Sequence, residues 1–348
     1  MKHLKLMAVL SLLLILTACG KEDAHLLSYT AQPKEPVVQQ APQQIQADFT
    51  VMIDGQTMEP GGVYFGGKWF VSWDGLSEAL DLTEKPELSL SVAGMSFVSL
   101  DDVCRDFDGV VLKDGERDHV YIITQDGQWQ IPEGYRVPIL MYHGVSDNMW
   151  GMTDLFIKPS EMEAQIVWIL ENGYTPIWFE DLPRVNEIEK PVMLTYDDGY
   201  VDNYVDLFPI LKKYNVKATI FVVTGTADYN PNSLTTQQIK ELSDSGLVSI
   251  QSHTVTHPYL RGMTREQQEY ELTKSYLDIA HITGKAPTVI CYPSGSYDDT
   301  TMELAKQYYR MGINMNGNDY VTGEDPYLVD RFYITRRDPL QKVIGCIQ

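Results

Sequence analysis

Short apolar segments alternate with longer amphipathic segments in the C-terminal part of the chain, which we place in one domain at 136–348 after a linker at 127–135. The apolar segments predict buried strands at 138–142, 192–196, 218–223, 248–251, 288–292 and 312–315. The amphipathic segments predict one helix that begins with a capping box, formed by Ser160 and Glu163, and other helices at 201–214, 235–245, 264–283 and 299–309. This alternation predicts an α/β fold with a parallel sheet and crossover helices, either open or closed into a barrel. In both arrangements functional side chains gather where strands end and loops begin.

A pattern of short strands bounded by turns covers 48–126 and predicts a small α+β domain. The sequence FVSWDGL at 70–76 recurs as FVSLDDV at 97–103, and each copy leads into a short amphipathic stretch. We therefore expect two copies of a strand–turn–helix unit, with Asp74 and Asp101 capping the helix starts. The pattern resembles the small non-catalytic N-terminal domain of copper amine oxidases. That resemblance implies a spacer or binding module.

The first residues have the composition of an export signal. A basic flank precedes an apolar run that is shorter than the ~20 residues of a transmembrane helix. The run ends in LTAC, which resembles the bacterial lipobox, and an ordinary secretion signal with an incidental cysteine is the alternative. We expect a signal peptide at 1–18, a lipidated Cys19 and a flexible tether over 19–47. The protein would then be exported and lipid-anchored to the outer face of a bacterial membrane, at the cell surface or in the periplasm.

Charge and composition exclude several classes of partner. The chain has 348 residues, with 27 Lys and Arg against 48 Asp and Glu, and its formal net charge is −21. Such acidity argues against nucleic acid or an anionic lipid surface as a partner, because a polyanion would be repelled over most of the protein. We therefore expect membrane contact only through the lipid anchor. Four cysteines in a chain of this length do not make a disulfide framework.

Two polar clusters directly follow predicted strands. They are TYDDG at 195–199 and SHTVTHP at 252–258. The β-branched residues and the proline of the second cluster disfavour a helix, so we expect its two histidines in a loop. Together the clusters supply one carboxylate and two imidazoles for a divalent ion, with positions left open for water and substrate, as in a catalytic metal site. The second carboxylate can take a proton from the metal-bound water.

The two motifs and their separation resemble those of the polysaccharide deacetylase family (NodB homology, carbohydrate esterase family 4). The resemblance implies a distorted (β/α) barrel and a metal-dependent hydrolase. It also implies that Asp197 is the catalytic base and that Asp198, His253 and His257 hold one divalent ion. Zinc suits this set of ligands, and cobalt and nickel stay open.

The third motif departs from the family pattern Arg-x-Pro-Tyr/Phe-Gly and reads CYPSG at 291–295. Its proline and glycine still allow the loop to offer a backbone N–H to an oxyanion, and we assign that N–H to Ser294. Cys291 stands where the family has the arginine that orients the base. Arg331 is the candidate substitute, with Arg336 behind it.

The late histidine motif that supplies the general acid in the family is missing from the C-terminal sequence. Instead, MYHG at 141–144 places His143 at the end of the first predicted strand of the α/β domain, before the Asp-Asp motif. This order resembles the circularly permuted branch of the family, which includes exported poly-N-acetylglucosamine deacetylases. The resemblance implies that His143 is the general acid.

These features predict a hydrolase that removes N-acetyl groups from N-acetylhexosamine residues of an extracellular or cell-wall polysaccharide. The expected partner is a glycan that contains N-acetylglucosamine. O-deacetylation, as on xylan, needs the same site and an easier leaving group, so it stays open. A decayed domain that only binds glycan is the non-enzyme alternative, suggested by the missing arginine and the missing late histidine.

Overall fold

The computed structural model describes residues 17–18, 39–40, 47–53, 56–66, 68–80, 89–92, 94–106, 109–114, 119–124 and 129–348. The chain divides into two compact units, 1–124 and 125–348. Cys19 lies outside the described residues, so its lipidation stays a prediction. Among the described helices, none has the length and apolar character that crossing a membrane requires.

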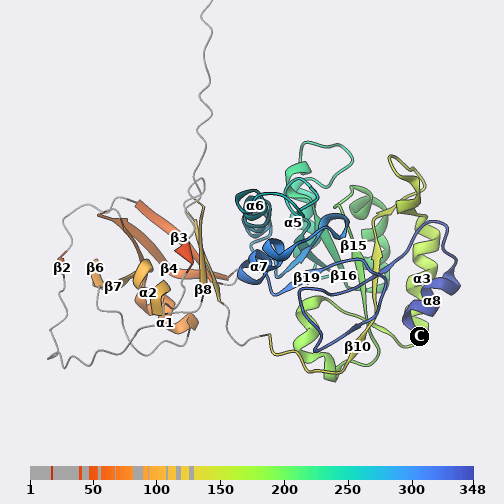
Figure 1. The fold of residues 1–348 in the computed structure, drawn as a ribbon, viewed down its shortest axis with the longest axis horizontal. Helices are drawn as coiled ribbons and strands as arrows, with labels where there is room; N and C mark the ends of the chain where they lie inside the picture. The colour runs from red at the N-terminus through yellow and green to blue at the C-terminus, as the bar shows by residue number, and fades with distance from the viewer. Residues whose placement is uncertain are drawn as a thin grey trace, which may run out of the picture. The chain divides into compact units, whose positions relative to one another are not determined.

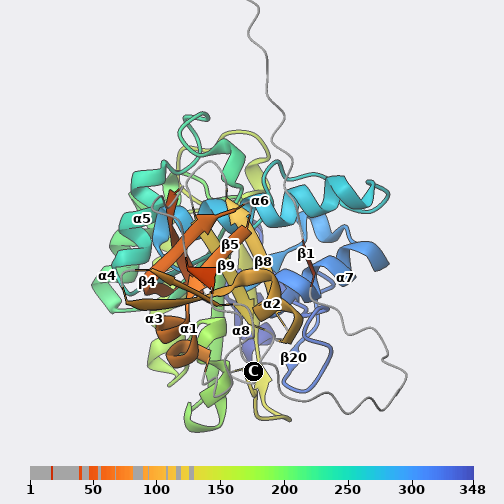
Figure 2. The same ribbon diagram turned by 90° about the vertical axis from the view of Figure 1, so that its left-hand side faces the viewer.

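The N-terminal unit is a mixed sheet covered by two short helices (Figure 2). The strand order is β1-β8-β9-β3-β4-β5-β7-β6-β2. Its strands are β1 Thr17–Ala18, β2 Gln39–Gln40, β3 Ala47–Ile53, β4 Gln56–Phe65, β5 Lys68–Ser72, β6 Ser89–Val92, β7 Met95–Ser99, β8 Gly109–Asp114 and β9 His119–Thr124. Its described helices are α1 Trp73–Leu80 and α2 Leu100–Asp106. This is the α+β composition that the sequence pattern predicts for 48–126.

The repeated sequence forms two strand–helix units that lie side by side. Strands β5 and β7 pair antiparallel, and Val71 lies directly opposite its repeat equivalent Val98. Each strand leads directly into a helix, α1 or α2. The prediction that Asp74 caps the first helix is wrong by two positions, because the hydroxyl of Ser72 accepts the hydrogen bond from the Gly75 N–H (3.4 Å). Serine has the same short oxygen acceptor that suits an aspartate to this position.

The second unit is an α/β fold built on a curled parallel sheet, a half-barrel, and this confirms the predicted fold class (Figure 1). The strand order of the main sheet is β19-β18-β17-β16-β15-β11-β21, and β14 also pairs with β15. The strands of the unit are β10 Arg136–Val137, β11 Ile139–Tyr142, β12 Gly144–Val145, β13 Phe156–Ile157, β14 Thr175–Pro176, β15 Pro191–Tyr196, β16 Ala218–Val222, β17 Val248–Ser252, β18 Val289–Cys291, β19 Met311–Ile313, β20 Tyr320–Val321 and β21 Phe332–Tyr333. Its α-helices are α3 Pro159–Glu171, α4 Phe208–Tyr214, α5 Thr236–Asp244, α6 Arg265–Thr283, α7 Asp299–Tyr308 and α8 Leu340–Ile347.

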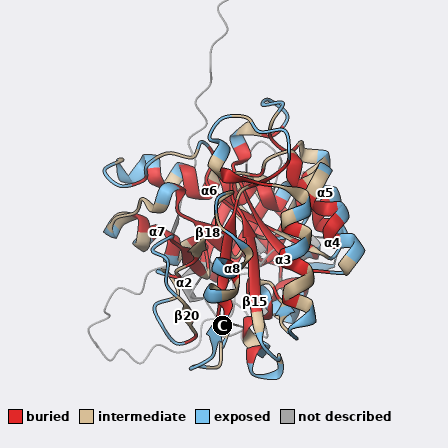
Figure 3. Cartoon of the chain, turned by 90° about the vertical axis from the view of Figure 1, so that its right-hand side faces the viewer, coloured by how far each residue is buried: buried red, intermediate tan, exposed pale blue. Residues whose placement is uncertain are grey.

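Alternating side chains of the parallel strands build two apolar clusters, one on each face of the sheet. On β15, Leu194 and Tyr196 belong to the cluster under the helices, whereas Met193 belongs to the cluster on the inner face. Helices α5, α6 and α7 form one neighbouring group and α3 and α8 another (Figure 1). The strands are almost wholly buried between the helices, whose outer surfaces are exposed (Figure 3).

The predicted helices differ from the observed ones mainly at their starts. Helices α5 and α6 begin directly after Thr235 and Thr264, whose side chains cap them. The capping box predicted at Ser160 is wrong, because α3 starts at Pro159 and has no side-chain cap. The helix predicted over 201–214 is a π-helical turn, η3 (Asn203–Leu207), followed by α4. The C-terminal helix α8 was not predicted, although its eight residues have an apolar face that includes buried Val343 and Ile347.

Close packing on β19 gives a test of the core. A Cβ added to Gly312 would lie 1.9 Å from the hydroxyl oxygen of Tyr292, which is buried. We expect Gly312→Ala to lower the free energy of unfolding by about 1–3 kcal/mol through overpacking. The matched control is Gly345→Ala on α8, where a Cβ meets nothing within 4 Å. That change should raise stability by up to about 1 kcal/mol. Thermal unfolding of both variants checks the prediction, and an equal stability of the two would contradict it.

Candidate active site

The polar motifs occupy the carboxyl ends of neighbouring parallel strands. Asp197 and Asp198 directly follow β15, and His253 directly follows β17, with β16 between the two strands. Asp197 continues the inward-facing positions of β15 that include Thr195. Asp198 has a left-handed backbone (φ 72°), which ends this alternation. Two adjacent aspartates therefore enter different surroundings.

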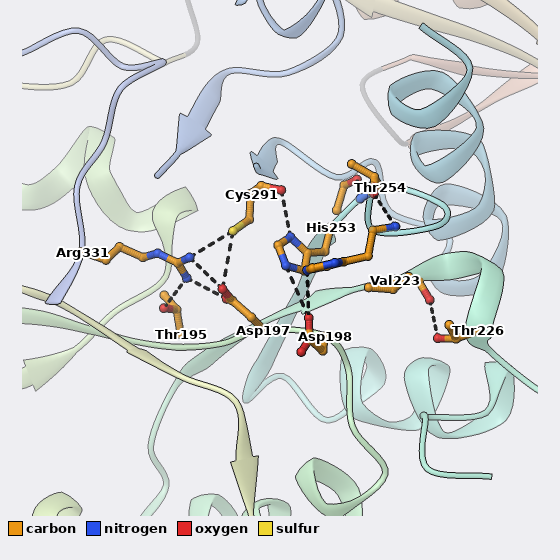
Figure 4. A network of polar contacts seen from close by, with 11 residues as sticks. Thr195, Asp197, Asp198, Val223, Thr226, His253, Thr254, Cys291 and Arg331 are labelled. Carbon is orange, nitrogen blue, oxygen red and sulfur yellow. Dashed lines mark hydrogen bonds and ion pairs between the residues drawn. The ribbon is translucent and has the colours of Figure 1, made fainter. Parts of the chain in front are cut away.

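Asp198, His253 and His257 form a cluster whose ligand atoms all lie within 4.8 Å of one another. Figure 4 shows the side chains of Asp198 and His253 facing each other. Oδ1 of Asp198 is 3.5 Å from Nε2 of His253 and 3.5 Å from Nε2 of His257. Ligand atoms about 2.1 Å from a tetrahedral ion lie about 3.4 Å apart, so these separations suit a small divalent cation. The His253 side chain is almost fully buried and the His257 side chain is 37% exposed, which leaves one side of the cluster open.

The protonation of His253 also fits a metal ligand. Its Nδ1 lies 2.9 Å from the backbone oxygen of Cys291, and a carbonyl oxygen can only accept. Nδ1 therefore carries the proton, and the lone pair of Nε2 faces Asp198. Burial lowers the pKa of His253 despite the opposing charges of Asp197 and Asp198, so the ring is held neutral. A neutral imidazole oriented by a carbonyl is the usual form of a ligating histidine.

Asp197 forms a buried two-pronged ion pair with Arg331 (Figure 4). The distances are 2.7 Å from Nη1 to Oδ1 and 2.8 Å from Nη2 to Oδ2. Burial by itself raises the pKa of Asp197, but the charge and hydrogen bonds of Arg331 outweigh it, with smaller contributions from His253 and His143. The pKa of Asp197 is therefore held well below its usual range, and the carboxylate stays ionised. The structure brings the predicted substitute arginine to the predicted base.

Cys291 occupies the remaining space beside this pair. Its Sγ accepts a hydrogen bond from Nη2 of Arg331 (3.0 Å) and lies 3.7 Å from Oδ2 of Asp197. Burial raises the pKa of the Cys291 thiol well above its ordinary value, so it stays protonated. Asp197, His253 and Cys291 form a second group with ligand spacing. We favour the cluster around Asp198, because both oxygens of Asp197 already accept hydrogen bonds from Arg331.

His143 stands at the end of β11, close enough to Asp197 to lower the pKa of that carboxyl. Its ring lies 5.9 Å from that of Tyr333, edge to face. Its backbone oxygen accepts a hydrogen bond from Nδ2 of Asn203 (2.9 Å), and Oδ1 of Asp202 accepts one from the N–H of Val145 (2.6 Å). Nδ1 of His143 is buried and has no hydrogen-bond partner among the described residues. The strand end is therefore fixed while the ring keeps a free nitrogen.

Ser294 and Arg336, the remaining residues considered from the sequence, form no hydrogen bond with Asp197 among the described residues. Ser294 is exposed in the short turn η5 (Pro293–Gly295) after β18, with a left-handed backbone (φ 54°). The turn is closed by the Gly295 N–H, which donates to the oxygen of Tyr292 (3.0 Å). Arg336, the other arginine considered as a substitute, donates to the backbone oxygen of Phe156 (3.2 Å) instead. The geometry therefore favours Arg331 over Arg336 as the partner of Asp197.

Two residues around the site were not found from the sequence. Glu271 on α6 holds the histidine loop, and Tyr333 packs on His143. Glu271 and Tyr333 carry no local motif, because their approach depends on the tertiary fold.

Glu271 stabilises a strained loop. Its Oε2 accepts from the backbone N–H groups of Val255 and Thr256, both at 2.9 Å, and its Oε1 accepts from the Thr256 hydroxyl (2.6 Å). Thr254 (φ 67°) and His257 (φ 57°) have left-handed backbones, which cost energy in non-glycine residues. A buried carboxylate with three donors offsets that cost and fixes the spacing of the two histidines.

Removing this charge should weaken divalent metal binding. We expect Glu271→Gln to raise the Kd for zinc or cobalt by about tenfold, because a glutamine NH2 would oppose one of the three donors. Calorimetric titration of the metal-free protein measures the effect. Glu266→Gln, at an exposed position of the same helix, is the matched control and should leave the Kd unchanged. Equal metal affinities of Glu271→Gln and the wild type would contradict the role of Glu271 in fixing the two histidines.

The buried carboxyl of Asp202, which accepts a hydrogen bond from Val145 two residues after His143, predicts a pH dependence of stability. Burial raises its pKa to about 6, with the charge of Asp206 adding to the rise and the Val145 N–H opposing it. The folded state therefore favours the protonated carboxyl, and this stabilisation, complete below pH ~4, is lost as the pH rises through ~6. Asp202→Asn removes the titration and keeps an acceptor for Val145. The difference in unfolding free energy between Asp202→Asn and the wild type should change by up to about 3 kcal/mol between pH 4 and pH 7. A difference that stays constant over this pH range would refute the assignment.

The sequence and the structure resemble known deacetylases. The sequence pattern of the family described as polysaccharide deacetylase matches residues 184–312. YxkH of Bacillus subtilis (strain 168), named for this family, is 38% identical over 184 residues, which are 51% of this chain and 64% of YxkH. The structure of BC0361, a polysaccharide deacetylase from Bacillus cereus, has a TM-score of 0.59 and 30% identity, over 69% of this chain and 76% of that chain. Poly-beta-1,6-N-acetyl-D-glucosamine N-deacetylase of Escherichia coli (strain K12) is 28% identical over 139 residues, 34% of this chain and 21% of that protein.

The similarity spans less than two thirds of the length of the two curated relatives. It covers more than two thirds of the Bacillus cereus structure at 30% identity, and it includes the half-barrel. The Asp-Asp and His-x-x-x-His motifs lie within the matched family region. On these grounds the chain belongs to the polysaccharide deacetylase family.

Proposed function

We propose that the chain is a metal-dependent hydrolase that removes N-acetyl groups from N-acetylhexosamine residues of an extracellular or cell-wall polysaccharide. The observation that carries the proposal is the cluster of Asp198, His253 and His257 directly beside the ionised Asp197. The name of the Escherichia coli relative supports an N-acetylglucosamine polymer as the substrate class and an amide as the bond that is cleaved.

The proposed site holds one divalent ion, with zinc favoured and cobalt or nickel also suited to a carboxylate and two imidazoles. Asp198, His253 and His257 would hold it. When bound, such an ion polarises the acetyl carbonyl and lowers the pKa of a nearby water. The open side at His257 leaves room for substrate.

Asp197 acts as the base in this proposal. Its carboxylate accepts a proton from the attacking water, whose oxygen bonds to the acetyl carbon. Arg331 holds both carboxylate oxygens in place and keeps Asp197 ionised before the reaction. The backbone N–H of Ser294 is assigned to the oxyanion that forms on the former carbonyl oxygen.

His143 is assigned to the leaving group. The C–N bond breaks as the imidazole gives a proton to the amine nitrogen, so the products are acetate and a free amino sugar. An amine needs this proton far more than an alcohol does, because an amide anion is a very poor leaving group. The position of His143 at the end of β11, close to Asp197, supports this role.

The surroundings of the enzyme are also proposed. We place the protein outside the cytoplasm, held to the outer face of a bacterial membrane by a lipid on Cys19 and separated from it by the tether at 19–47. The N-terminal unit would act as a spacer or binding module between the anchor and the deacetylase domain. The glycan then meets the enzyme away from the lipid surface.

Acetate release from defined substrates tests the mechanism. We expect Asp197→Asn to lower kcat about 10²–10⁴-fold on both N-acetylglucosamine oligomers and 4-nitrophenyl acetate. His143→Ala should show a comparable loss on the oligomers and a much smaller loss on the ester, whose leaving group departs without a proton. Metal titration of both variants serves as the control for folding.

Three results would count against the proposal. Near-normal amide hydrolysis by His143→Ala would remove its role as the acid. Acetate release from acetylxylan without release from N-acetylglucosamine oligomers or peptidoglycan would indicate an O-deacetylase. A wild-type protein that binds no divalent metal stoichiometrically would point to a domain that only binds glycan.

A further inference from the structure

Three aromatic side chains form a contiguous group next to the proposed metal cluster. The ring of Trp150 lies 4.4 Å from that of Tyr200 and 5.3 Å from that of Phe156, in both cases edge to face. Tyr200 and Phe156 are stacked nearly parallel, 5.6 Å apart. We call these three residues the aromatic wall.

The wall begins at a proposed metal ligand. Tyr200 directly follows the Asp-Asp-Gly motif. Burial raises the pKa of the Tyr200 phenol, and the charge of Asp198 adds to the rise, so the phenol lies close to that carboxylate. Through Tyr200, the wall extends from Asp198 to Trp150. A group bound at the metal cluster therefore has an aromatic surface as an immediate neighbour.

Trp150 is half-buried, whereas its neighbours at 147–149 and 151–153 are exposed. Met152, two residues on, is 72% exposed, and Met149 is exposed as well. Trp150 is the one that the structure holds in a defined place, against Tyr200 and Phe156.

The ends of the Trp150 loop are fixed. Strands β12 and β13, which flank the loop, pair with each other in parallel. A Cβ at Gly144 on β12 would lie 2.3 Å from the Phe156 ring, so the glycine permits this close approach. The oxygen of Asp154 accepts from the Arg336 N–H (3.0 Å). The indole is therefore presented on a braced loop, which lowers the entropic cost of binding a ligand.

We propose that the aromatic wall is a sugar-binding subsite, in which a pyranose ring adjacent to the reacting residue packs on Trp150. The subsite rests on the proposed function, because it takes a neighbouring sugar of the same glycan. A pyranose has an apolar face of C–H groups that packs on an indole, and its hydroxyls stay hydrated at the half-exposed position. An uncharged ligand also suits a chain with a net charge of −21. Trp150 would then select chains over single sugars.

A binding experiment that does not depend on catalysis tests the subsite. The probe is the pentamer of N-acetylglucosamine, titrated calorimetrically into the metal-free full chain. We expect Trp150→Ala to raise the Kd about tenfold, which corresponds to ~1.4 kcal/mol. Trp150→Phe should bind within about threefold of the wild type, because it keeps an aromatic face. Met152→Ala, on the same loop, is the matched control and should leave the Kd unchanged.

A kinetic experiment separates binding from structural support. With metal present, Trp150→Ala should raise KM for the pentamer about tenfold and leave 4-nitrophenyl acetate hydrolysis within about twofold of the wild type. An unchanged Kd and KM would overturn the subsite. So would equal losses on the pentamer and the ester, because these would indicate that Trp150 only supports Tyr200. Failure of the wild type to bind the pentamer at all would also overturn it.

The result distinguishes the subsite from the proposed function. If the wild type binds the pentamer in a Trp150-dependent way and releases no acetate, the subsite stands and the proposed deacetylation is wrong. If it releases acetate and Trp150→Ala behaves as the wild type, deacetylation stands and the subsite is wrong.

Discussion

The ion pair between Asp197 and Arg331 is the interaction on which the active site depends. Both side chains are almost fully buried, and removing two charges from water costs several kcal/mol per ion unless their partners are well placed. Arg331 meets this condition, since its guanidinium also donates to the oxygen of Asn314 (3.1 Å) and the hydroxyl of Thr195 (3.0 Å). Arg331 directly precedes β21, and its hydrogen bonds reach Asp197 after β15, Cys291 at the end of β18 and Asn314 after β19. One charge pair thus joins the ends of these strands at the site.

This pair explains why two neighbouring aspartates can have different roles. Asp197 continues the inward alternation of β15 and meets a buried cation, whereas the left-handed backbone of Asp198 places its carboxylate at the two histidines. The carboxylate of Asp197 is held ionised by Arg331, whereas the carboxylate of Asp198 lies where it can ligate a metal ion together with the two histidines. A shift of one residue in the strand would exchange their surroundings, because side chains alternate between the faces of a sheet.

The sequence predicted the elements and clusters that depend on local rules. Alternating apolar and amphipathic segments placed the parallel strands, and they placed the starts of α5 and α6 to within one residue. Asp198 and His253 could be expected to meet, because the carboxyl ends of parallel strands share one edge. Glu271 could not be found, since a buried carboxylate in a helix has the same sequence appearance as an exposed one until the histidine loop is packed against it. The capping box predicted at Ser160 was wrong for a similar reason. The local sequence is compatible with a cap at Ser160, but α3 begins one residue earlier, at Pro159.

The replacement at Cys291 shows what the site constrains. The family pattern has an arginine at this position, and here the guanidinium arrives from Arg331 on another segment. A second arginine at 291 would place two buried cations against one carboxylate, and one of them would stay uncompensated. A thiol is small and neutral: Cys291 accepts from Arg331 at 3.0 Å and its pKa is raised, so it adds no charge. The requirement is therefore one positive charge at Asp197, whichever segment supplies it. Comparison of the motif alone shows that the arginine is absent at position 291. The fold is needed to show that Arg331 supplies the positive charge instead.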